Sequence, residues 1–439
     1  MTQPENSIPV MVKKARNGYV RLSSAKHEER IAILARLKQG LLVKKDQVFE
    51  ANKTDSEKAA SKKLSGPLLQ RLKIDENKIN SLVAGIDELI AKEDSILQAL
   101  ESTQLDSGLD LYKVSVPIGV ILVIFEARPD VVVQIASLAI KSGNAVILKG
   151  GSEAEETNRK LVEIVKDALG DFRDAVDIVF EREDIAVLLK MDKEIDLVIP
   201  RGSYELVKYV LGNTNIPVIG HTAGICSIYL DVDANRETAV SVVIDAKTQY
   251  SGACNSVETL LVHKDACERV LVPVLKELQG HGVDVRGCAR AVAFAEKSGM
   301  KISKAKADDF DTEFSDLVLA AKIVDSVEDA VEHINTHGSH HTDSVITTNR
   351  ACAMIFLKGV DSACVFWNAS TRFSDGYRFG KGAEIGISTG KIHARGPVGI
   401  EGMLTYKYIL VGQGQTVEPY VTGKATFTHK KLESGLTLD

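Results

Sequence analysis

The sequence lacks paired cysteines and long apolar runs, and each absence excludes a class of protein. Its six cysteines include no Cys-x-x-Cys pair, which argues against zinc ribbons and thioredoxin-type redox pairs. Six scattered thiols in a chain of 439 residues fit a reducing compartment better than a disulfide framework. No segment approaches the roughly 20 apolar residues that a membrane-spanning helix needs. We therefore expect a protein without a membrane segment.

An excess of positive charge is also lacking. Lys and Arg number 54 against 60 Asp and Glu, which gives a formal net charge of −6. Nucleic-acid binding needs a positive surface, so nucleic acid is not the expected partner. Residues 1–14 hold no apolar run of the kind found in a secretory signal. These features predict a cytoplasmic protein.

The order of helical and extended patterns indicates an α/β fold. Residues 25–64 and 75–100 are amphipathic and predict helices, with a break at Ser65-Gly66-Pro67. From residue 109 onward strands and helices alternate, which favours parallel sheets covered by helices on both faces. The expected strands are 109–116, 120–125, 145–148, 175–179, 195–199, 218–219, 225–230 and 258–262. The expected helices are 129–141, 153–169 with Ser152 as cap, 185–191, 203–211, 234–250 and 265–279.

Two glycine-rich segments differ in what they indicate. Gly380-Lys381-Gly382 has the wrong spacing for a dinucleotide fingerprint and predicts a loop. Lys149, by contrast, ends an apolar strand and precedes Gly150-Gly151. Open parallel sheets bind ligands at the carboxyl ends of their strands, so Lys149 is either a ligand contact or a solvated lysine in a turn.

Three further segments carry residue types that can act in catalysis, metal binding or anion binding. Cys254 lies among small residues in 250–259, where it is either a nucleophile or a small buried residue. His333, His337, His340 and His341 cluster in sequence, but Gly338 ends their helix, so we expect no metal site and favour anion contacts or structural hydrogen bonds. The polar segments 368–377 and 383–402 contain arginines suited to forked contacts with phosphate or carboxylate, although two surface arginines would look the same.

Together these segments resemble one family. The motifs are Val116-Pro117-Ile118-Gly119-Val120, Phe125-Glu126-Ala127-Arg128-Pro129-Asp130, residues 142–151, Ala253-Cys254-Asn255-Ser256-Val257-Glu258-Thr259, the His-Thr-Asp segment at 341–343, Asn368-Ala369-Ser370-Thr371-Arg372-Phe373 and His393-Ala394-Arg395-Gly396-Pro397-Val398-Gly399. In this order they are similar to the γ-glutamyl phosphate reductases, or glutamate-5-semialdehyde dehydrogenases, a branch of the aldehyde dehydrogenase superfamily. The resemblance spans about residues 10–420 and lacks the kinase domain of the bifunctional enzymes.

The resemblance implies an aldehyde-dehydrogenase-like fold with two Rossmann-like parallel-sheet domains and a small β-flap for oligomerisation. We expect residues 1–106 and 118–231 to form the NADP-binding domain and 232–385 the catalytic domain. The flap would comprise 107–117 and 403–415, and 386–402 would return to the cofactor domain.

The implied reaction is the NADPH-dependent reduction of L-glutamyl 5-phosphate to L-glutamate 5-semialdehyde, the second step from glutamate to proline. Cys254 would attack as a thiolate and form a thioester, with its own backbone N–H as one oxyanion donor. In hydrolytic aldehyde dehydrogenases a glutamate activates water. The resemblance puts His221 at that position, which suits a reductase that must not hydrolyse its thioester.

The same resemblance assigns further contacts. The residues expected to bind the cofactor NADPH are Lys149, Ser152, Gly202, Ser203 and Glu313. Those expected to bind the anionic substrate are Arg128, Asn255, Arg372 and Arg395. Ser152 stands where NAD-using members carry a glutamate, so no carboxylate there would repel a 2′-phosphate.

Two alternatives stay open. One is another acylating or an oxidative semialdehyde dehydrogenase, and the other is a catalytically inactive scaffold of the same fold. The expected partners are the small-molecule substrate and further copies of the chain in a homo-oligomer, and channeling with glutamate 5-kinase is a hypothesis.

Overall fold

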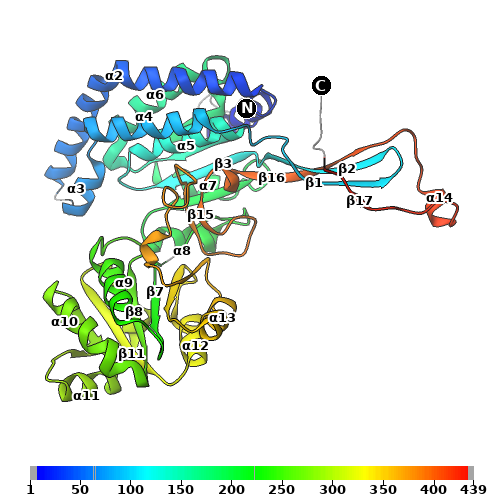
Figure 1. Cartoon of the computed structure of the whole chain (residues 1–439). Coiled ribbons are helices and arrows are strands. Elements are labelled where there is room, and N and C mark those ends of the chain that lie inside the picture. The colour runs from blue at the N-terminus through cyan, green and yellow to red at the C-terminus, as the bar shows by residue number, and fades with distance from the viewer. Residues whose placement is uncertain (1–6, 63, 65, 222, 434–439) are drawn as a thin grey trace. The chain divides into compact units, whose positions relative to one another are not determined.

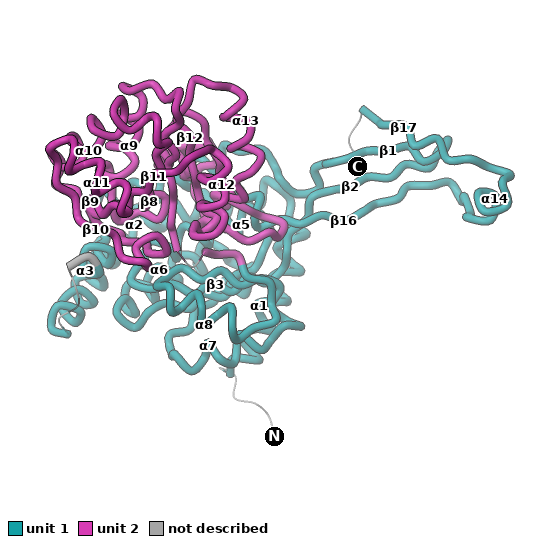
Figure 2. Tube along the Cα trace, turned by 90° about the horizontal axis from the view of Figure 1, so that it is seen from below, with its two compact units in different colours: residues 1–218, 399–439 teal, residues 219–398 magenta. Residues whose placement is uncertain are grey.

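The computed structural model describes residues 7–433 except 63, 65 and 222. The chain forms two compact units, one of residues 1–218 and 399–439 and the other of residues 219–398 (Figure 2). Each unit has its own parallel sheet, which confirms the predicted α/β class. In the described part of the chain, no helix is both long and apolar enough to cross a membrane.

The first unit is built on a four-stranded parallel sheet. Its order is β5-β4-β3-β6, formed by Val176–Val179, Ala145–Lys149, Val120–Phe125 and Leu197–Arg201. All six residues of the central strand β3 are buried, as expected for a strand covered on both faces. The helices are α1 Ile8–Ser23, α2 His27–Ser61, α3 Gly66–Leu72, α4 Glu76–Ala91, α5 Asp130–Ser142, α6 Glu155–Leu169, α7 Arg182–Leu188, α8 Tyr204–Asn213 and α14 Glu418–Val421 (Figure 1).

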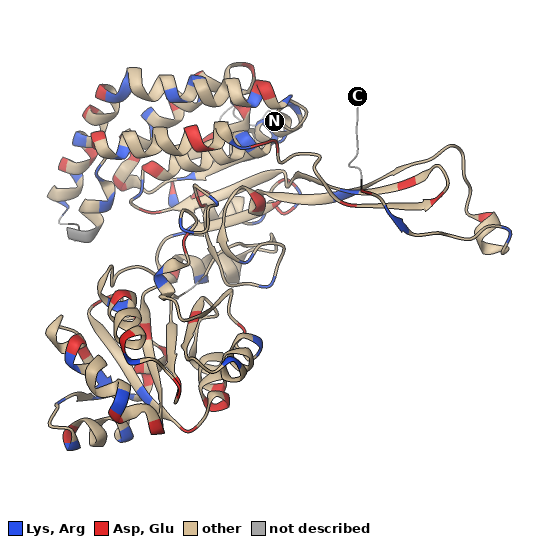
Figure 3. Cartoon of the chain, viewed as in Figure 1, with Lys and Arg blue, Asp and Glu red and all other residues tan. Residues whose placement is uncertain are grey.

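Helix α2 follows the predicted amphipathic pattern. Ile33, Leu34, Leu37 and Leu41 are buried along one stripe, while acidic and basic residues alternate on its exposed face (Figure 3). The break after α2 falls partly on Ser65, which lies outside the described residues. Helix α1 was not predicted, although Val12, Ala15 and Leu22 are buried along one of its faces.

The predicted cap of the helix after β4 is wrong. Ser152 begins a short 3₁₀ turn, Ser152–Ala154, and is exposed. Helix α6 starts at Glu155 without a local side-chain cap. Its first turn is capped instead by the buried Asp55 of α2, which accepts hydrogen bonds from the Thr157 N–H at 2.8 Å and the Thr157 hydroxyl at 2.6 Å.

An antiparallel sheet in the first unit replaces the smaller predicted flap. Its order is β16-β2-β1-β17, formed by Leu404–Val411, Leu109–Pro117, Ala99–Asp106 and Lys430–Lys431. Helix α4 ends at Ala91, so the predicted helix over 75–100 is wrong from residue 92. The flap therefore starts at Ala99 rather than at 107, because Gly108, at φ +70°, turns β1 back onto β2.

The second unit contains a seven-stranded parallel sheet. Its order is β10-β9-β11-β8-β7-β12-β13, formed by Ser303–Lys304, Asp284–Gly287, Val318–Val324, Val257–His263, Cys226–Leu230, Thr342–Ile346 and Cys364–Trp367. A separate hairpin pairs β14 Gly386–Ser388 with β15 Gly396–Val398. The helices are α9 Arg236–Thr248, α10 Val272–Gly280, α11 Ala289–Lys297, α12 Val327–His337 and α13 Arg350–Gly359.

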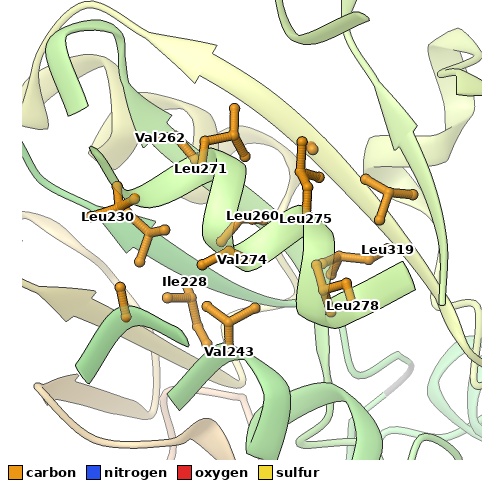
Figure 4. Packing of buried hydrophobic residues seen from close by; sticks show 14 of the residues in the cluster. Ile228, Leu230, Val243, Leu260, Val262, Leu271, Val274, Leu275, Leu278 and Leu319 are labelled. Atoms are coloured by element: carbon orange, nitrogen blue, oxygen red, sulfur yellow. The ribbon is translucent and has the colours of Figure 1, made fainter. Parts of the chain in front are cut away.

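Both expected boundaries of the catalytic unit differ from the structure. Strand β7 pairs with β8 and β12, so 219–231 belongs to the second unit rather than to the cofactor domain. The hairpin β14–β15 also belongs there, and the chain returns to the first unit at Gly399. The core under α9 and α10 is formed by aliphatic side chains, among them Ile228, Leu260 and Val274 (Figure 4).

Candidate active site

Cys254 lies in the loop that joins α9 to β8. The loop is folded by two turns, in which the Ala253 N–H donates to the Tyr250 carbonyl at 3.2 Å and the Ser256 N–H to the Ala253 carbonyl at 2.8 Å. Gly224 approaches so closely that a Cβ there would fall 2.0 Å from the Cys254 carbonyl oxygen. Only glycine therefore allows this contact. The main chain around the thiol is fixed by the two turns of its own loop and by the close packing of Gly224.

Three adjacent strands bring two imidazoles to this thiol. β7 lies between β8 and β12 in the sheet, and His221, Cys254 and His341 each precede one of these strands. In parallel strands the amino ends share one edge of the sheet, so the three side chains meet there. One ring nitrogen of each histidine and the Cys254 Sγ lie within 4.8 Å of one another.

The orientation of the two rings is defined by their hydrogen bonds. His221 Nδ1 lies 3.0 Å from the Ile387 carbonyl oxygen, and a carbonyl accepts only, so Nδ1 carries the proton. His341 Nδ1 lies 2.8 Å from the Thr342 hydroxyl. The two rings meet edge to face, with their centroids 5.3 Å apart.

The sequence cluster of histidines is divided by the fold. His333 and His337 stay together on α12, with ring centroids 4.5 Å apart, and His337 pairs with Asp311 at 2.8 Å. His340 contacts the Asp361 carbonyl oxygen, while His341 joins Cys254 and His221. Sequence spacing therefore did not identify the cluster at the thiol, whose shared signal is a position just before a parallel strand.

Burial separates Cys254 from most of the other thiols. Burial raises the pKa of Cys226 well above its usual value and also raises that of Cys364. It raises the pKa of Cys267 to about 11 and that of Cys352 to about 12. Cys254 and Cys288 are partly exposed. Of these two, Cys254 has the imidazole neighbours, so it is the candidate nucleophile.

Arg372 lies near the thiol and is mostly buried. Its Nε donates to Gln249 Oε1 at 2.9 Å, and its guanidinium lies 5.9 Å from the centre of the Tyr250 ring. Burial lowers the pKa of Arg372, and among the groups opposing this shift is Cys254. The guanidinium is therefore within electrostatic range of the proposed nucleophile.

The other predicted residues of this unit are engaged by protein groups. Asn255 is buried and donates to the Ser374 carbonyl at 2.8 Å, while its Oδ1 has no hydrogen-bond partner among the described residues. Glu313 Oε2 accepts from the Gly224 N–H at 2.9 Å. Arg395 forms an ion pair with Asp361 at 3.2 Å and also donates to its carbonyl. The structure thus gives Arg395 a loop-stabilising contact.

The predicted cofactor residues of the first unit follow adjacent strands. Lys149 ends β4 and Gly202-Ser203 follow β6, so they lie at the carboxyl edge of the sheet. Arg128, which was predicted to bind the substrate, follows β3 at this same edge of the first unit. Lys149 is largely buried, and this burial lowers its pKa. Ser203 caps α8, and its N–H donates to Glu126 Oε2 at 2.9 Å.

Groups of both charges lie at this edge of the sheet. Ser152 is exposed beside Lys149 and brings a hydroxyl instead of a carboxylate. The carboxylates of Glu153, Asp184 and Glu126 all act electrostatically on Lys149, and Glu153 Oε1 also accepts from the Ala127 N–H at 2.5 Å. This edge therefore carries carboxylates as well as a cation and a hydroxyl.

Comparisons with known proteins agree with this architecture. Residues 3–285 match the model of the aldehyde dehydrogenase family. The chain is 46% identical to the γ-glutamyl phosphate reductase of Acetivibrio thermocellus, over 98% of this chain and 100% of that protein. The crystal structure of γ-glutamyl phosphate reductase from Thermotoga maritima is similar with a TM-score of 0.90 and 36% identity, covering 92% of this chain and 98% of that one. An acetylating aldehyde dehydrogenase from Geobacillus thermoglucosidasius shares the fold, with a TM-score of 0.62 and 16% identity over 92% of this chain and 96% of that one.

Proposed function

The chain belongs to the aldehyde dehydrogenase family and, within it, to the γ-glutamyl phosphate reductases, and on this basis we propose that it reduces L-glutamyl 5-phosphate to L-glutamate 5-semialdehyde with NADPH and releases phosphate. The observation that carries the proposal is the partly exposed Cys254 thiol beside two imidazoles. This is the second step from glutamate to proline.

Cys254 performs the covalent step. Its thiolate attacks the carbonyl carbon of the acyl phosphate, the carbon–oxygen bond to phosphate breaks, and a thioester remains on Sγ. Phosphate is a good leaving group, so it departs without a general acid. Bound NADPH supplies the hydride that reduces this thioester. The carbon–sulfur bond then breaks, which releases the aldehyde and restores the thiolate.

The residues around Cys254 stabilise charge and limit water attack. The Cys254 backbone N–H is the nominated donor to the oxyanion that forms on the carbonyl oxygen. Arg372 offers a buried guanidinium to an anionic group of the substrate, which has a phosphate and an α-carboxylate. His221 stands in place of the water-activating glutamate of hydrolytic relatives, so the thioester persists until it is reduced.

The first unit holds the cofactor in this proposal. Lys149 would pair with the adenosine 2′-phosphate and the Ser152 hydroxyl would donate to it, while Gly202 and Ser203 would contact the pyrophosphate. The proposal is supported by the largely buried ammonium of Lys149 at the carboxyl end of β4.

The antiparallel flap is proposed to join copies of the chain. Its edge strand β16 carries one charged residue, Lys407, and exposes Tyr406, Tyr408 and Leu410 by more than half of their surface. Exposed apolar groups on an edge strand favour association with another surface. Light scattering should find an oligomer in the wild type and a smaller species in Tyr408→Asp. An association with glutamate 5-kinase stays a hypothesis.

The reverse reaction tests the proposed activity. With glutamate semialdehyde, the enzyme should reduce NADP⁺ only when inorganic phosphate is present. Cys254→Ser should abolish this activity while cofactor binding and the circular dichroism spectrum stay normal. Phosphate-independent oxidation, or dependence on coenzyme A, would instead indicate one of the related dehydrogenases, and inactivity with every acyl donor would indicate a scaffold.

A further inference from the structure

The side chain of His341 has a nitrogen that the fold does not use. His341 is fully buried, and its Nδ1 lies 2.8 Å from the Thr342 hydroxyl. Its Nε2 is also buried and has no hydrogen-bond partner among the described residues. Leaving a buried polar atom unpaired costs free energy, so a ligand that engaged Nε2 would bind with an advantage.

The neighbours of His341 supply the remaining parts of a site for a soft metal ion. His221 Nδ1 donates to the Ile387 carbonyl at 3.0 Å, so Nε2 is the ring nitrogen that we assign to the metal. A backbone carbonyl in this role is the usual support behind a metal-binding histidine. Cys254 adds a sulfur, and one ligand atom from each residue lies within 4.8 Å of the others.

The spacing and chemistry match zinc. Zn²⁺ binds imidazole nitrogen at about 2.0–2.1 Å and thiolate sulfur at about 2.3 Å in tetrahedral geometry. Two ligand atoms on one zinc ion are then about 3.5 Å apart, so small side-chain rotations close the present spacing. Two histidines and one cysteine leave the fourth position open to water. Cys226 Sγ contacts the Cys254 carbonyl oxygen at 3.4 Å and His341 Nδ1 at 3.7 Å, but it is not part of the group whose ligand atoms all lie within 4.8 Å of one another.

We propose that His221, Cys254 and His341 form a Zn²⁺ site at which the metal ion reversibly blocks the Cys254 thiol. Binding releases the thiol proton and forms bonds from zinc to one sulfur and two nitrogens, without any redox change. A sulfur that shares a lone pair with zinc is a much weaker nucleophile toward an acyl group. Metal binding itself does not depend on the proposed reductase activity, whereas the resulting inhibition rests on it.

Cobalt gives a readout of the site that needs no turnover. The full-length protein, titrated with Co²⁺, should develop a near-ultraviolet sulfur-to-cobalt absorption band, and Zn²⁺ should displace it with a stoichiometry of one ion per chain. Cys254→Ala should abolish the band. His221→Ala and His341→Ala should each weaken Zn²⁺ binding at least about tenfold, measured by competition with a chromogenic chelator. The matched control is His337→Ala, which removes a histidine outside the cluster and should leave the affinity unchanged.

Alkylation gives a second readout should a histidine variant fold poorly. In the wild type, Zn²⁺ should protect Cys254 from iodoacetamide, as seen by peptide mass spectrometry, and EDTA should restore labelling. The partly exposed Cys288 should label equally with and without zinc. A cobalt band that persists in Cys254→Ala, unchanged affinity in folded His341→Ala, or unprotected Cys254 would overturn the proposal. Zinc binding in a protein without reductase activity would uphold this site and reject the proposed function.

Discussion

Lys247 and Glu258 form an ion pair of 2.7 Å in which both side chains are fully buried. Lys247 lies at the end of α9 and Glu258 at the start of β8, so the pair joins the two ends of the loop that carries Cys254. Glu258 Oε1 also accepts from the Ser315 N–H at 3.3 Å. The position of the proposed nucleophile therefore depends on a buried charge pair outside the loop.

Removing one partner of this pair should be more harmful than removing both. Lys247→Met leaves a buried carboxylate uncompensated, which typically costs about 3–5 kcal/mol. Lys247→Met/Glu258→Leu removes both charges and should recover a large part of that loss. Urea denaturation, monitored by far-ultraviolet circular dichroism, measures the free energy of unfolding of each variant. Equal destabilisation of the single and double variants would contradict the argument.

His333 should make the second unit less stable in acid. Burial, together with Lys322 and His337, lowers its pKa from 6.5 to about 3, with nearby Asp311 opposing the shift. Between these two pH values the unfolded chain binds more protons than the folded one, so stability is complete above about pH 6.5 and falls as pH decreases. At pH 5 this loss is about 2 kcal/mol.

A non-titrating variant isolates this effect. His333→Gln keeps an acceptor near the Lys322 ammonium, which lies 3.0 Å from His333 Nδ1, and should flatten the stability profile between pH 5 and 7. His281→Gln removes an exposed histidine elsewhere in the second unit and serves as the control. Thermal melts across this pH range provide the measurement. An unchanged slope in His333→Gln would assign the acid sensitivity to other groups.

The arginines of the second unit should differ in their effect on activity. Arg372 is held near Cys254, and Arg372→Ala should lower kcat/KM at least about tenfold, since a charge-assisted hydrogen bond contributes about 1.5–3 kcal/mol. Arg395 is paired with Asp361, so Asp361→Asn should reproduce most of the effect of Arg395→Ala. Steady-state kinetics with varied acyl phosphate distinguishes them. If kcat/KM is normal in Asp361→Asn but lowered in Arg395→Ala, Arg395 binds the substrate rather than stabilising the loop.

The sequence predicted the class of fold because period-2 and period-3.6 patterns are local. It identified buried strands such as Val120–Phe125 within a residue or two. It misplaced β1 and the cap of α6, because these depend on contacts made far along the chain, as between Asp55 and Thr157. The cluster of His221, Cys254 and His341 was missed for the same reason, since only strand order brings these residues together.

His221→Glu should add a hydrolytic activity. The ring of His221 lies in the cluster around Cys254, so a carboxylate there would stand near the thioester and activate water. The variant should oxidise glutamate semialdehyde with NADP⁺ in the absence of phosphate, which the wild type should not do. His221→Gln has similar size without a base and is the matched control. Phosphate-independent oxidation by both variants, or by neither, would contradict the role given to this position.

Ser152→Glu should shift the preference from NADPH toward NADH. Ser152 is exposed beside the strand-end Lys149, and a carboxylate there would repel the 2′-phosphate of NADPH but accept hydrogen bonds from the ribose hydroxyls of NADH. Two like charges about 4 Å apart cost about 4 kcal/mol at an effective dielectric of 20. NADPH use should therefore fall far more than NADH use.

The ratio of kcat/KM for the two cofactors is the relevant quantity, because it cancels general losses of activity. Ser152→Gln, of the same size but uncharged, separates repulsion from crowding and should change the ratio much less than Ser152→Glu. Lys149→Met should lower NADPH use selectively, since the pairing cation is removed. A wild-type preference for NADH, or equal NADPH:NADH ratios in the Glu and Gln variants, would show that Lys149 and Ser152 do not recognise the 2′-phosphate.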